Sequence, residues 1–319
     1  MTSSWFDLAI NNSSLLIMWG ALLLHWVLPI PTAMHPLTIW QRLAVMIAEK
    51  VNHSNDSPKQ QTLAGSLAWF TLWGLALIFF IALYQLVQLD SVFQLTLLWL
   101  ALDWRSIDEF GQRFTQAYQQ ENKPLSQHLL APWVHRNVAP LSLLGLGKAG
   151  AETLLVGYGR NVITVLFWYC IGGGLGALLY RLASGLARAW SPTRSQFQFF
   201  GQTASKITAL LDIVPMRIFS LLLCFGNNGK QALQGLQQQG ENWLSPGPGW
   251  LLIASGHKLS IALGGPALYH DKKRERPRIG GRIAPAGFHL EQLLLLLRQR
   301  LLVWLLLLSI TLIIFHLGG

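Results

Sequence analysis

The last 19 residues of the chain, LLVWLLLLSITLIIFHLGG, contain no aspartate, glutamate, lysine or arginine. At about 1.5 Å per residue, a helix of this length nearly spans the hydrocarbon core of a bilayer, which is about 30 Å thick. The whole chain suits that environment, because 52% of its residues are hydrophobic and only 12% are charged, whereas soluble domains have about 25% charged residues. The sequence therefore predicts an integral membrane protein.

Five further apolar segments are candidate membrane spans. Each is bounded by polar or basic residues, as membrane helices usually are. The segment 249–263 is a weaker candidate, because His257 and Lys258 in its middle favour a buried or interfacial position. We therefore expect an all-α integral membrane protein with about five transmembrane helices, drawn from the C-terminal segment and from residues 15–31, 67–84, 92–102, 162–180 and 207–226.

The distribution of lysine and arginine predicts which loops face the cytoplasm. No Lys or Arg precedes the first apolar segment, while basic residues occur in the loops at about 32–63, 103–160 and 265–298. We expect these loops to be cytoplasmic, in a single membrane-embedded domain that covers residues 1–319 and lies in a bacterial inner membrane. The glycine triplet at 172–174 leaves two alternatives open, since a glycine-rich segment can cross the bilayer or dip and return.

The predicted loops contain helical patterns of their own. Phe110, Phe114 and Tyr118 recur at intervals of four and predict a helix over 106–120 with one apolar face. Shorter helices are expected from about residue 126 to just before Pro132 and over 230–239. The apolar segment 143–155 is expected to lie on the bilayer or to pack against the spans.

Residues 263–281, LGGPALYHDKKRERPRIGG, join tight turns to a dense basic cluster. Proline and glycine within the cluster exclude a regular helix, so the sequence predicts a shaped cationic loop. One interpretation is a polybasic patch that meets lipid head groups. The other is a site that binds an anion through arginine side chains and backbone NH groups, with Gly264, Gly265, Pro266, Arg276, Pro277 and Gly280 as candidate ligand-binding residues.

The chain has 24 Lys and Arg against 14 Asp and Glu, a formal net charge of +10. This excess fits membrane topology and attraction to anionic lipids, and it also fits a phosphorylated small molecule as ligand. Nucleic acid is not expected as a partner, because the basic residues are scattered between apolar segments. The histidines form no metal motif and Cys170 and Cys224 lie in apolar segments, so neither a metal site nor a disulfide framework is predicted.

Two further charged residues lie in apolar surroundings. Glu152 either pairs with Lys148, one helical turn earlier, or belongs to a functional site. Arg217 is costly in an apolar segment unless it pairs with an acid or faces a polar cavity. It therefore either forms an ion pair with Asp212 or contacts a ligand phosphate.

An ordered set of motifs resembles the CobD/CbiB family of cobalamin biosynthesis membrane proteins, which perform adenosylcobinamide-phosphate synthesis. The matches cover most of the chain: His35-Pro36-Leu37, Val134-His135-Arg136-Asn137, Glu152-Thr153-Leu154, Leu166-Phe167-Trp168, Tyr180-Arg181, Phe200-Gly201, Pro215-Met216-Arg217, Gly264-Gly265-Pro266, Tyr269 and Arg276-Pro277 with Gly280. The resemblance implies a ligase that uses ATP and Mg²⁺ to join adenosylcobyric acid, a corrinoid, to an aminopropanol phosphate. It also implies that Glu152 is the catalytic acid, and that the ligand-binding residues include Arg136, Tyr180, Arg181, Arg217 and Tyr269.

The chain departs from the resembled family at its carboxylates. Where the family has acidic or amide residues, this sequence has Asn137, Val156, Gly157, Arg160, Ser184, Ala187, Thr208, Ala209 and Asp212. Mg-ATP is normally held through carboxylates and phosphate oxygens, so the basic elements of the site remain while most groups that could hold Mg²⁺ are replaced. Two hypotheses stay open: a divergent synthase, and a catalytically degenerate member that acts as a membrane sensor or regulator. The oligomeric state is not predicted.

Overall fold

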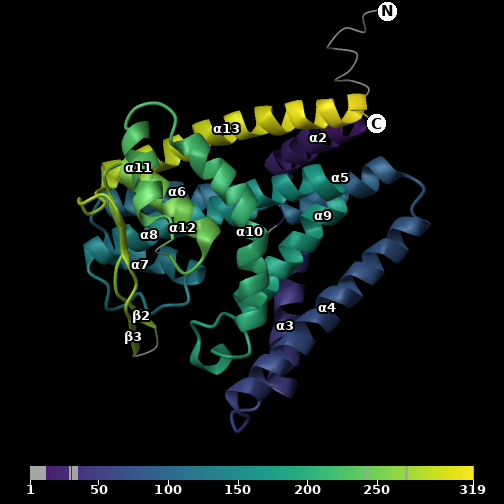
Figure 1. Cartoon of the computed structure of the whole chain (residues 1–319), viewed down its shortest axis with the longest axis horizontal. Coiled ribbons are helices and arrows are strands. Elements are labelled where there is room, and N and C mark those ends of the chain that lie inside the picture. The colour runs from purple at the N-terminus through teal and green to yellow at the C-terminus, as the bar shows by residue number, and fades with distance from the viewer. Residues whose placement is uncertain (1–11, 29, 31–34, 242, 270–271, 319) are drawn as a thin grey trace, which may run out of the picture.

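The computed structural model describes residues 12–28, 30, 35–241, 243–269 and 272–318, which are mostly helical (Figure 1). The helices are α2 (Ser13–Val27), α3 (Pro36–Val51), α4 (Pro58–Leu86), α5 (Asp90–Ala101), α6 (Trp104–Gln119), α7 (Lys123–Leu130), α8 (Leu143–Tyr158), α9 (Thr164–Ala189), α10 (Gln202–Leu223), α11 (Gly229–Gln239), α12 (Pro246–Lys258) and α13 (Gly287–Gly318). Short helical turns are η1 (Ala131–Trp133), the π-helix η2 (Gly159–Ile163) and η3 (Ser195–Phe197). Four short strands between α12 and α13 are β1 (Ala262–Gly264), β2 (Ala267–Tyr269), β3 (Lys272–Arg274) and β4 (Arg278–Gly280).

Three described helical segments are long and apolar enough to cross a membrane: α4, the continuous segment Leu143–Ala189 and α13. The expectation of about five spans is not confirmed. Residues 15–31 and 92–102 form α2 and α5, helices of 15 and 12 residues, while a span needs about 20. Residues 207–226 fall mostly in α10, which is long enough but carries Lys206, Asp212 and Arg217. The structure supports a membrane protein with three candidate spans.

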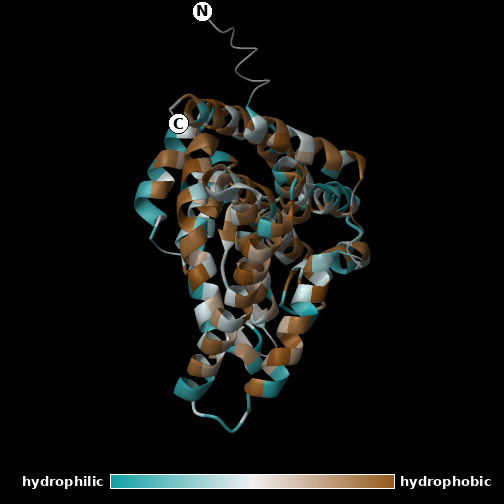
Figure 2. Ribbon diagram, turned by 90° about the vertical axis from the view of Figure 1, so that its right-hand side faces the viewer, coloured by the Kyte–Doolittle hydropathy of each residue, from teal (hydrophilic) through white to brown (hydrophobic). Residues whose placement is uncertain are grey.

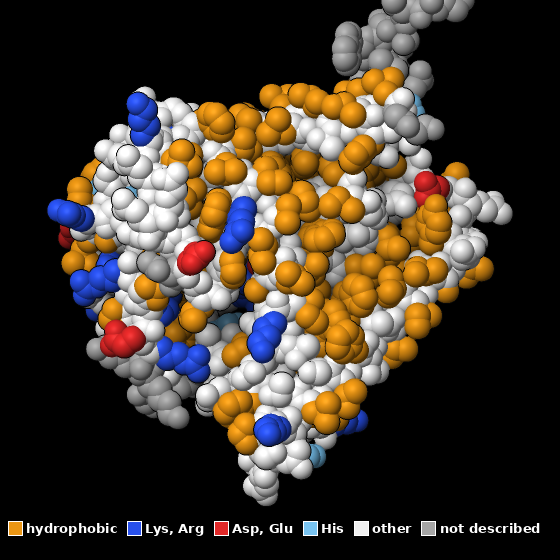
Figure 3. All heavy atoms as spheres, viewed as in Figure 1, with side chains coloured by type: hydrophobic (Ala, Val, Ile, Leu, Met, Phe, Trp, Pro, Cys, Tyr) orange, Lys and Arg blue, Asp and Glu red, His pale blue; other side chains and the backbone are white. Residues whose placement is uncertain are grey.

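Helices α4 and α13 expose large apolar side chains. In the ribbon of Figure 2, which is coloured by hydropathy, the long helices are mostly hydrophobic. On α4, Leu67, Phe70 and Ile78 are 60–65% exposed, and on α13 the exposed side chains include Leu302 and Ile314. Figure 3 shows hydrophobic side chains spread continuously over the side of the molecule formed by these helices. Exposing apolar surface to water costs about 25 cal/mol per Å², so this face is typical of one that contacts lipid.

Capping residues fix where α4 and α8 begin. Ser57 accepts a hydrogen bond from the NH of Gln60 and donates its own NH to the Gln60 side chain, which forms a capping box. Pro58 follows at the first helical position, where its missing NH costs nothing. Ser142 caps α8 by accepting a hydrogen bond from the NH of Gly145. The start of α8 sets the position of the polar residues further along that helix.

The glycine triplet at 172–174 bends α9. Gly172 and Gly173 have non-helical dihedral angles, and the φ of +60° at Gly173 lies in the left-handed region that favours glycine. The Gln94 side chain on α5 accepts a hydrogen bond from the NH of Gly174 and so satisfies a backbone donor at the bend. After the bend the helix continues to Ala189 and carries two arginines, Arg181 and Arg188.

The predicted aromatic face of α6 is confirmed. Phe110, Phe114 and Tyr118 are buried, and the ring centroids of successive residues lie 5.4 and 6.0 Å apart. This face packs against α8 and α13, and the segment 143–155 is correspondingly a buried helix, α8. The face therefore holds the helix that carries Glu152.

Two other predicted helices are found with small shifts at their ends. The helix predicted over 230–239 is α11, which begins one residue earlier. The helix predicted from residue 126 begins at Lys123, because the side chain of Asn122 caps it by accepting a hydrogen bond from the NH of Leu125. The segment 249–263 lies mostly in the buried helix α12, as its His257 and Lys258 suggested.

The 263–281 loop forms two nested antiparallel ladders. Strand β1 pairs with β4, and β2 pairs with β3. Gly264, Gly265 and Gly280 all have positive φ, and a Cβ atom on Gly264 would lie 2.3 Å from the carbonyl oxygen of Pro277. Only glycine fits that crossing without strain. The predicted shaped loop is confirmed, and its four strands are a departure from the all-α expectation.

Candidate anion-binding site

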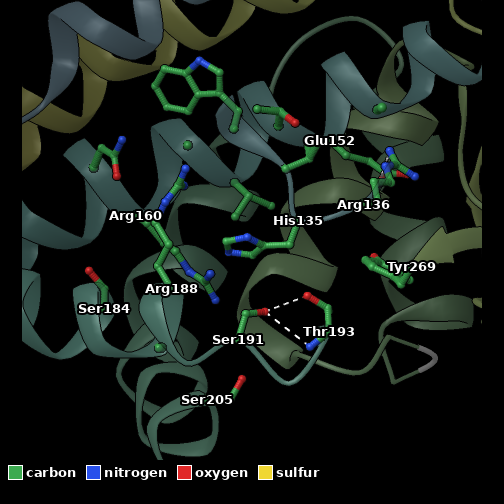
Figure 4. A pocket seen from close by; sticks show the side chains of 18 of the residues that line it. His135, Arg136, Glu152, Arg160, Ser184, Arg188, Ser191, Thr193, Ser205 and Tyr269 are labelled. Atoms are coloured by element: carbon green, nitrogen blue, oxygen red, sulfur yellow. Dashed lines mark hydrogen bonds and ion pairs between the residues drawn. The ribbon is translucent and has the colours of Figure 1, made fainter. Parts of the chain in front are cut away.

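A polar pocket of about 300 Å³ lies beside the 263–281 loop (Figure 4). Its walls come from α8, η2, α9, the segment 133–136 and the loop itself. In Figure 4, Arg160 and Arg188 reach in from one side, and Arg136, Glu152 and Tyr269 lie on the other. We call it the arginine pocket, because it is lined by five arginines: Arg136, Arg160, Arg181, Arg188 and Arg276.

Glu152 holds the 263–281 loop against α8. Its Oε1 atom accepts a hydrogen bond of 2.9 Å from the NH of Gly264, and both terminal nitrogens of Arg276 lie 3.0 and 3.3 Å from its oxygens. A terminal nitrogen of Arg136 lies 3.6 Å from Oε2. The alternative that paired Glu152 with Lys148 is wrong, because two arginines distant in sequence reach this carboxylate.

Arg276 is fully engaged within the protein. Besides its two contacts with Glu152, its Nε atom donates to the carbonyl of Gly265 at 3.0 Å, and its guanidinium lies over the Trp243 ring, 5.4 Å from the centroid. A bidentate arginine–carboxylate pair of this kind has a defined geometry. Arg276 therefore fixes the shape of the loop at the edge of the pocket.

A second acid, Asp212 on α10, lies behind the pocket with no exposed surface. The Nε atom of Arg160 lies 2.8 Å from one of its oxygens, and the Tyr180 hydroxyl donates to the other at 2.7 Å. Both oxygens of this carboxylate are therefore engaged. Tyr180 is buried and touches Asp212 without lining the pocket.

Arg217 lies away from the arginine pocket, and the alternative that paired it with Asp212 is wrong. Its guanidinium lies 4.7 Å from the centroid of the Trp250 ring on α12, a cation–π contact. Asp212 pairs with Arg160 instead, because η2 brings that arginine to α10 from a distant part of the sequence. The prediction that Arg217 contacts a ligand phosphate is not tested by this arrangement.

A third acid, Asp103, precedes α6. A terminal nitrogen of Arg181 lies 3.1 Å from its Oδ2 atom, and Arg181 also donates to the side chain of Asn161. The Nε atom of Arg181 is buried and has no hydrogen-bond partner among the described residues. Arg181 therefore joins the end of α5 to the wall of the pocket and keeps one donor unused.

Arg188 is one of two pocket arginines that sequence reasoning missed, the other being Arg160. A terminal nitrogen donates to the carbonyl of Pro132 at 2.8 Å, and within the described part of the chain Arg188 forms no ion pair. It lies seven residues after Arg181 on α9, which places both on one helix face. That spacing is the signal in the sequence that could have identified it.

The pocket has more positive than negative charge. Three of its five guanidinium groups pair closely with carboxylates: Arg276 with Glu152, Arg160 with Asp212 and Arg181 with Asp103. Two positive charges are left over, on Arg136 and Arg188. Such a pocket attracts an anion with about two negative charges.

The structure brings together five of the predicted site residues at the arginine pocket: Arg136, Glu152, Arg181, Tyr269 and Arg276. The turn residues of the loop shape its backbone and do not line the pocket; they are Gly264, Gly265, Pro266, Pro277 and Gly280. Their predicted part in ligand binding is not tested. Among residues that were not predicted, the pocket adds Arg160, Arg188 and the hydroxyl side chains of Ser191, Thr193 and Ser205.

A second pocket of about 430 Å³ adjoins the first. The two share one wall, formed by Trp133, Asn161, Arg181, Ser184 and Arg188. The second pocket is also lined by His35, whose ring accepts a hydrogen bond from the NH of Leu37 at the start of α3. Burial, and then the neighbouring positive charge of Arg181, lower the pKa of His35 below its usual value. The two pockets therefore lie side by side.

The acids at the arginine pocket do not fit a Mg²⁺ site. Mg²⁺ is usually bound through one or two carboxylates together with substrate phosphates. Here both oxygens of Glu152 and of Asp212 accept bonds from protein donors, and Asp103 is paired with Arg181. Among the described residues no three His, Cys, Asp or Glu side chains form a group that could hold a metal ion.

Comparisons with a family model and with known proteins both find the same family, and the matches cover nearly the whole chain. The family model described as CobD/Cbib protein matches residues 18–297. A cobalamin biosynthesis protein CobD from Stutzerimonas stutzeri is 31% identical over 297 residues, which are 91% of this chain and 95% of that protein. A protein of the same name from Chromobacterium violaceum is 27% identical over 89% of this chain and 92% of its own length. No solved structure matches.

Proposed function

The chain belongs to the CobD/CbiB protein family, and from this membership we propose that it works in cobalamin biosynthesis. In finer terms, we propose that it attaches an aminopropanol phosphate to the corrinoid adenosylcobyric acid, forming adenosylcobinamide phosphate, in the inner membrane of a bacterium. The apolar faces of α4 and α13 support a location in the bilayer. The arginine pocket is then the place at which a phosphate group of this step is bound.

The observation that carries this proposal is the charge of the pocket. A phosphate monoester has about 1.5 to 2 negative charges at pH 7, which matches the two positive charges on Arg136 and Arg188 that no described carboxylate neutralises closely. Arginine suits phosphate because two of its NH groups can bind two oxygens at once. ATP, which the family resemblance implies, would be attracted by the same charges.

The described residues have different parts in this proposal. Arg136 and Arg188 bind the phosphate, and Arg160 and Arg181 surround it from η2 and α9. Glu152 positions the loop, because its oxygens accept bonds from Gly264 and Arg276. Its action as a catalytic acid stays a prediction. The adjoining pocket offers room for the remainder of a ligand larger than the arginine pocket alone can hold.

Genetic complementation tests the proposed step. The chain is expressed in a bacterial strain that lacks its own adenosylcobinamide-phosphate synthase and is fed adenosylcobyric acid. We expect corrinoid-dependent growth to be restored, and we expect Arg188→Gln to reduce it while Arg113→Gln, which changes an exposed arginine on α6, leaves it unchanged. Absence of growth, with the protein found in the membrane fraction, would contradict the proposed step.

A second candidate function, a membrane sensor that binds a phosphorylated ligand without converting it, is favoured by one observation. All three carboxylates at the pocket are paired with arginines, so none is left free to take a proton from a substrate. The same complementation experiment separates the two functions. A sensor gives no growth, yet the purified protein still binds the phosphorylated ligand.

A further inference from the structure

Arg160 is held in an unusual way at the wall of the arginine pocket. Only its Nε atom contacts Asp212, at 2.8 Å, and its two terminal nitrogens have no hydrogen-bond partner among the described residues. The side chain is 34% exposed, and it lines the pocket beside Arg181 and Arg188. The Nε edge of the guanidinium therefore contacts the buried Asp212, and its other edge is left for the arginine pocket.

We propose that the arginine pocket binds its phosphate-bearing ligand without a divalent cation, and that Arg160 supplies the bridging positive charge that Mg²⁺ would otherwise supply. The inference rests on the proposed function only in assuming that the ligand carries phosphate. In a Mg²⁺ site the cation lies between a protein carboxylate and the phosphate oxygens. Here the carboxylate is Asp212, the guanidinium of Arg160 takes the place of the cation, and its terminal nitrogens donate to the phosphate.

The residues around Arg160 hold its guanidinium in this bridging position. Asp212 is wholly buried, and a buried charge needs a partner of opposite sign. Its two oxygens are divided between Arg160 and Tyr180, so its position is fixed by two donors. A guanidinium stays charged at physiological pH and presents its NH groups in a rigid fork, so the bridge needs no metal to remain positive.

The backbone at Arg160 is a π-helical turn between α8 and α9. Such turns are rare, widen the helix locally and occur frequently at functional sites. In this protein the turn lies against α10: a Cβ atom on Gly159 would come within 2.8 Å of the Met216 side chain. The close packing of η2 on α10 allows Arg160 to reach Asp212 while its far edge still lines the pocket.

The test compares binding with and without metal. The wild-type protein in lipid nanodiscs is titrated with 1-amino-2-propanol O-phosphate by calorimetry, once with excess EDTA and once with millimolar MgCl₂. We expect the two dissociation constants to agree within about twofold. Binding that appears only with MgCl₂ would overturn this inference and leave the proposed function standing, whereas no binding under either condition would overturn both.

A paired substitution tests the role of Arg160 itself. Arg160→Gln combined with Asp212→Asn removes both charges and keeps an amide that can accept from Tyr180, so no unpaired buried acid is created. We expect its affinity in EDTA to fall about tenfold or more, the value of one charge-assisted contact. An affinity equal to that of the wild type would overturn the inference, since Arg160 would then neutralise Asp212 without binding the ligand. If the pair of substitutions prevents folding, the metal comparison on the wild type still decides the matter.

Discussion

Replacement of Glu152 by Gln is expected to release the 263–281 loop from α8 and to lower the stability of the protein substantially. Glu152 is nearly buried and pairs with Arg276 and Arg136, while it also accepts the NH of Gly264. A glutamine can keep the backbone hydrogen bond but leaves two nearly buried guanidinium groups without their carboxylate. Removing one partner of a buried ion pair costs about 3–5 kcal/mol. The expected result is a lower thermal midpoint in detergent and faster tryptic cleavage after the exposed arginines of the loop, Arg274 and Arg278.

A matched control for this change is Glu109→Gln on α6. Glu109 also lies within 4 Å of two arginines, Arg105 and Arg113, but these pairs are 44–71% exposed. Exposed ion pairs contribute about 0–1 kcal/mol, so the control is expected to resemble the wild type in both measurements. If Glu152→Gln were cleaved no faster than Glu109→Gln, the account of Glu152 as the residue that holds the loop would be contradicted.

The second large effect is expected from replacing both Arg136 and Arg188 by Gln. Within the described part of the chain, Arg136 has only a longer ion pair, 3.6 Å from a carboxylate that it shares with Arg276, and Arg188 forms no ion pair and donates to a backbone carbonyl. A hydrogen bond to a charged group contributes about 1.5–3 kcal/mol, and about 1.4 kcal/mol corresponds to a tenfold change in affinity. We therefore expect the affinity for 1-amino-2-propanol O-phosphate to fall at least about a hundredfold.

The control for the double substitution removes the same net charge elsewhere. Arg105→Gln with Arg113→Gln takes two positive charges from the exposed face of α6, so any general effect of net charge appears in both proteins. We expect the control to bind the phosphate within about threefold of the wild type at physiological salt, because neither arginine lines the two pockets and salt screens exposed charges. Equal losses of affinity in the two proteins would contradict a specific role for Arg136 and Arg188.

Much of the architecture could be predicted from local patterns in the sequence. The apolar stretch at 67–84 lies in α4 and the described part of the C-terminal stretch, 301–318, lies in α13, two of the three candidate spans. The four-residue spacing of Phe110 and Phe114 predicted the buried face of α6. The glycines and prolines of the 263–281 loop correctly excluded a helix there. These features depend on neighbours in the chain, which a sequence displays directly.

There is a physical reason why the expectation of about five spans is not confirmed. Apolar composition does not distinguish a helix that crosses lipid from a short one buried among other helices. The face of α5 that includes Phe93, Leu97 and Leu98 is buried within the protein, although the segment reads as a span by hydropathy. Length was the better guide, because α2 and α5 are both shorter than a bilayer requires.

The pairing of charges in the site could not be predicted from local spacing. One of the two alternatives for Arg217 paired it with Asp212, five residues away, yet Asp212 pairs with Arg160, which precedes it by 52 residues. One of the two alternatives for Glu152 paired it with Lys148, yet Glu152 pairs with Arg276, 124 residues later. Both observed ion pairs join elements that are distant in the sequence and adjacent only in the folded protein. The spacing of Arg181 and Arg188 on one helix face was visible in the sequence, and it is the signal that should have added Arg188 to the site.

The central claim, that the arginine pocket binds a phosphate-bearing ligand, is tested most directly by titrating the wild-type protein in nanodiscs with 1-amino-2-propanol O-phosphate and, in parallel, with unphosphorylated 1-amino-2-propanol. The account predicts saturable binding of the phosphorylated compound, weaker at higher salt, and no measurable binding of the other. Equal binding of the two compounds, or none of the phosphorylated one, would contradict it.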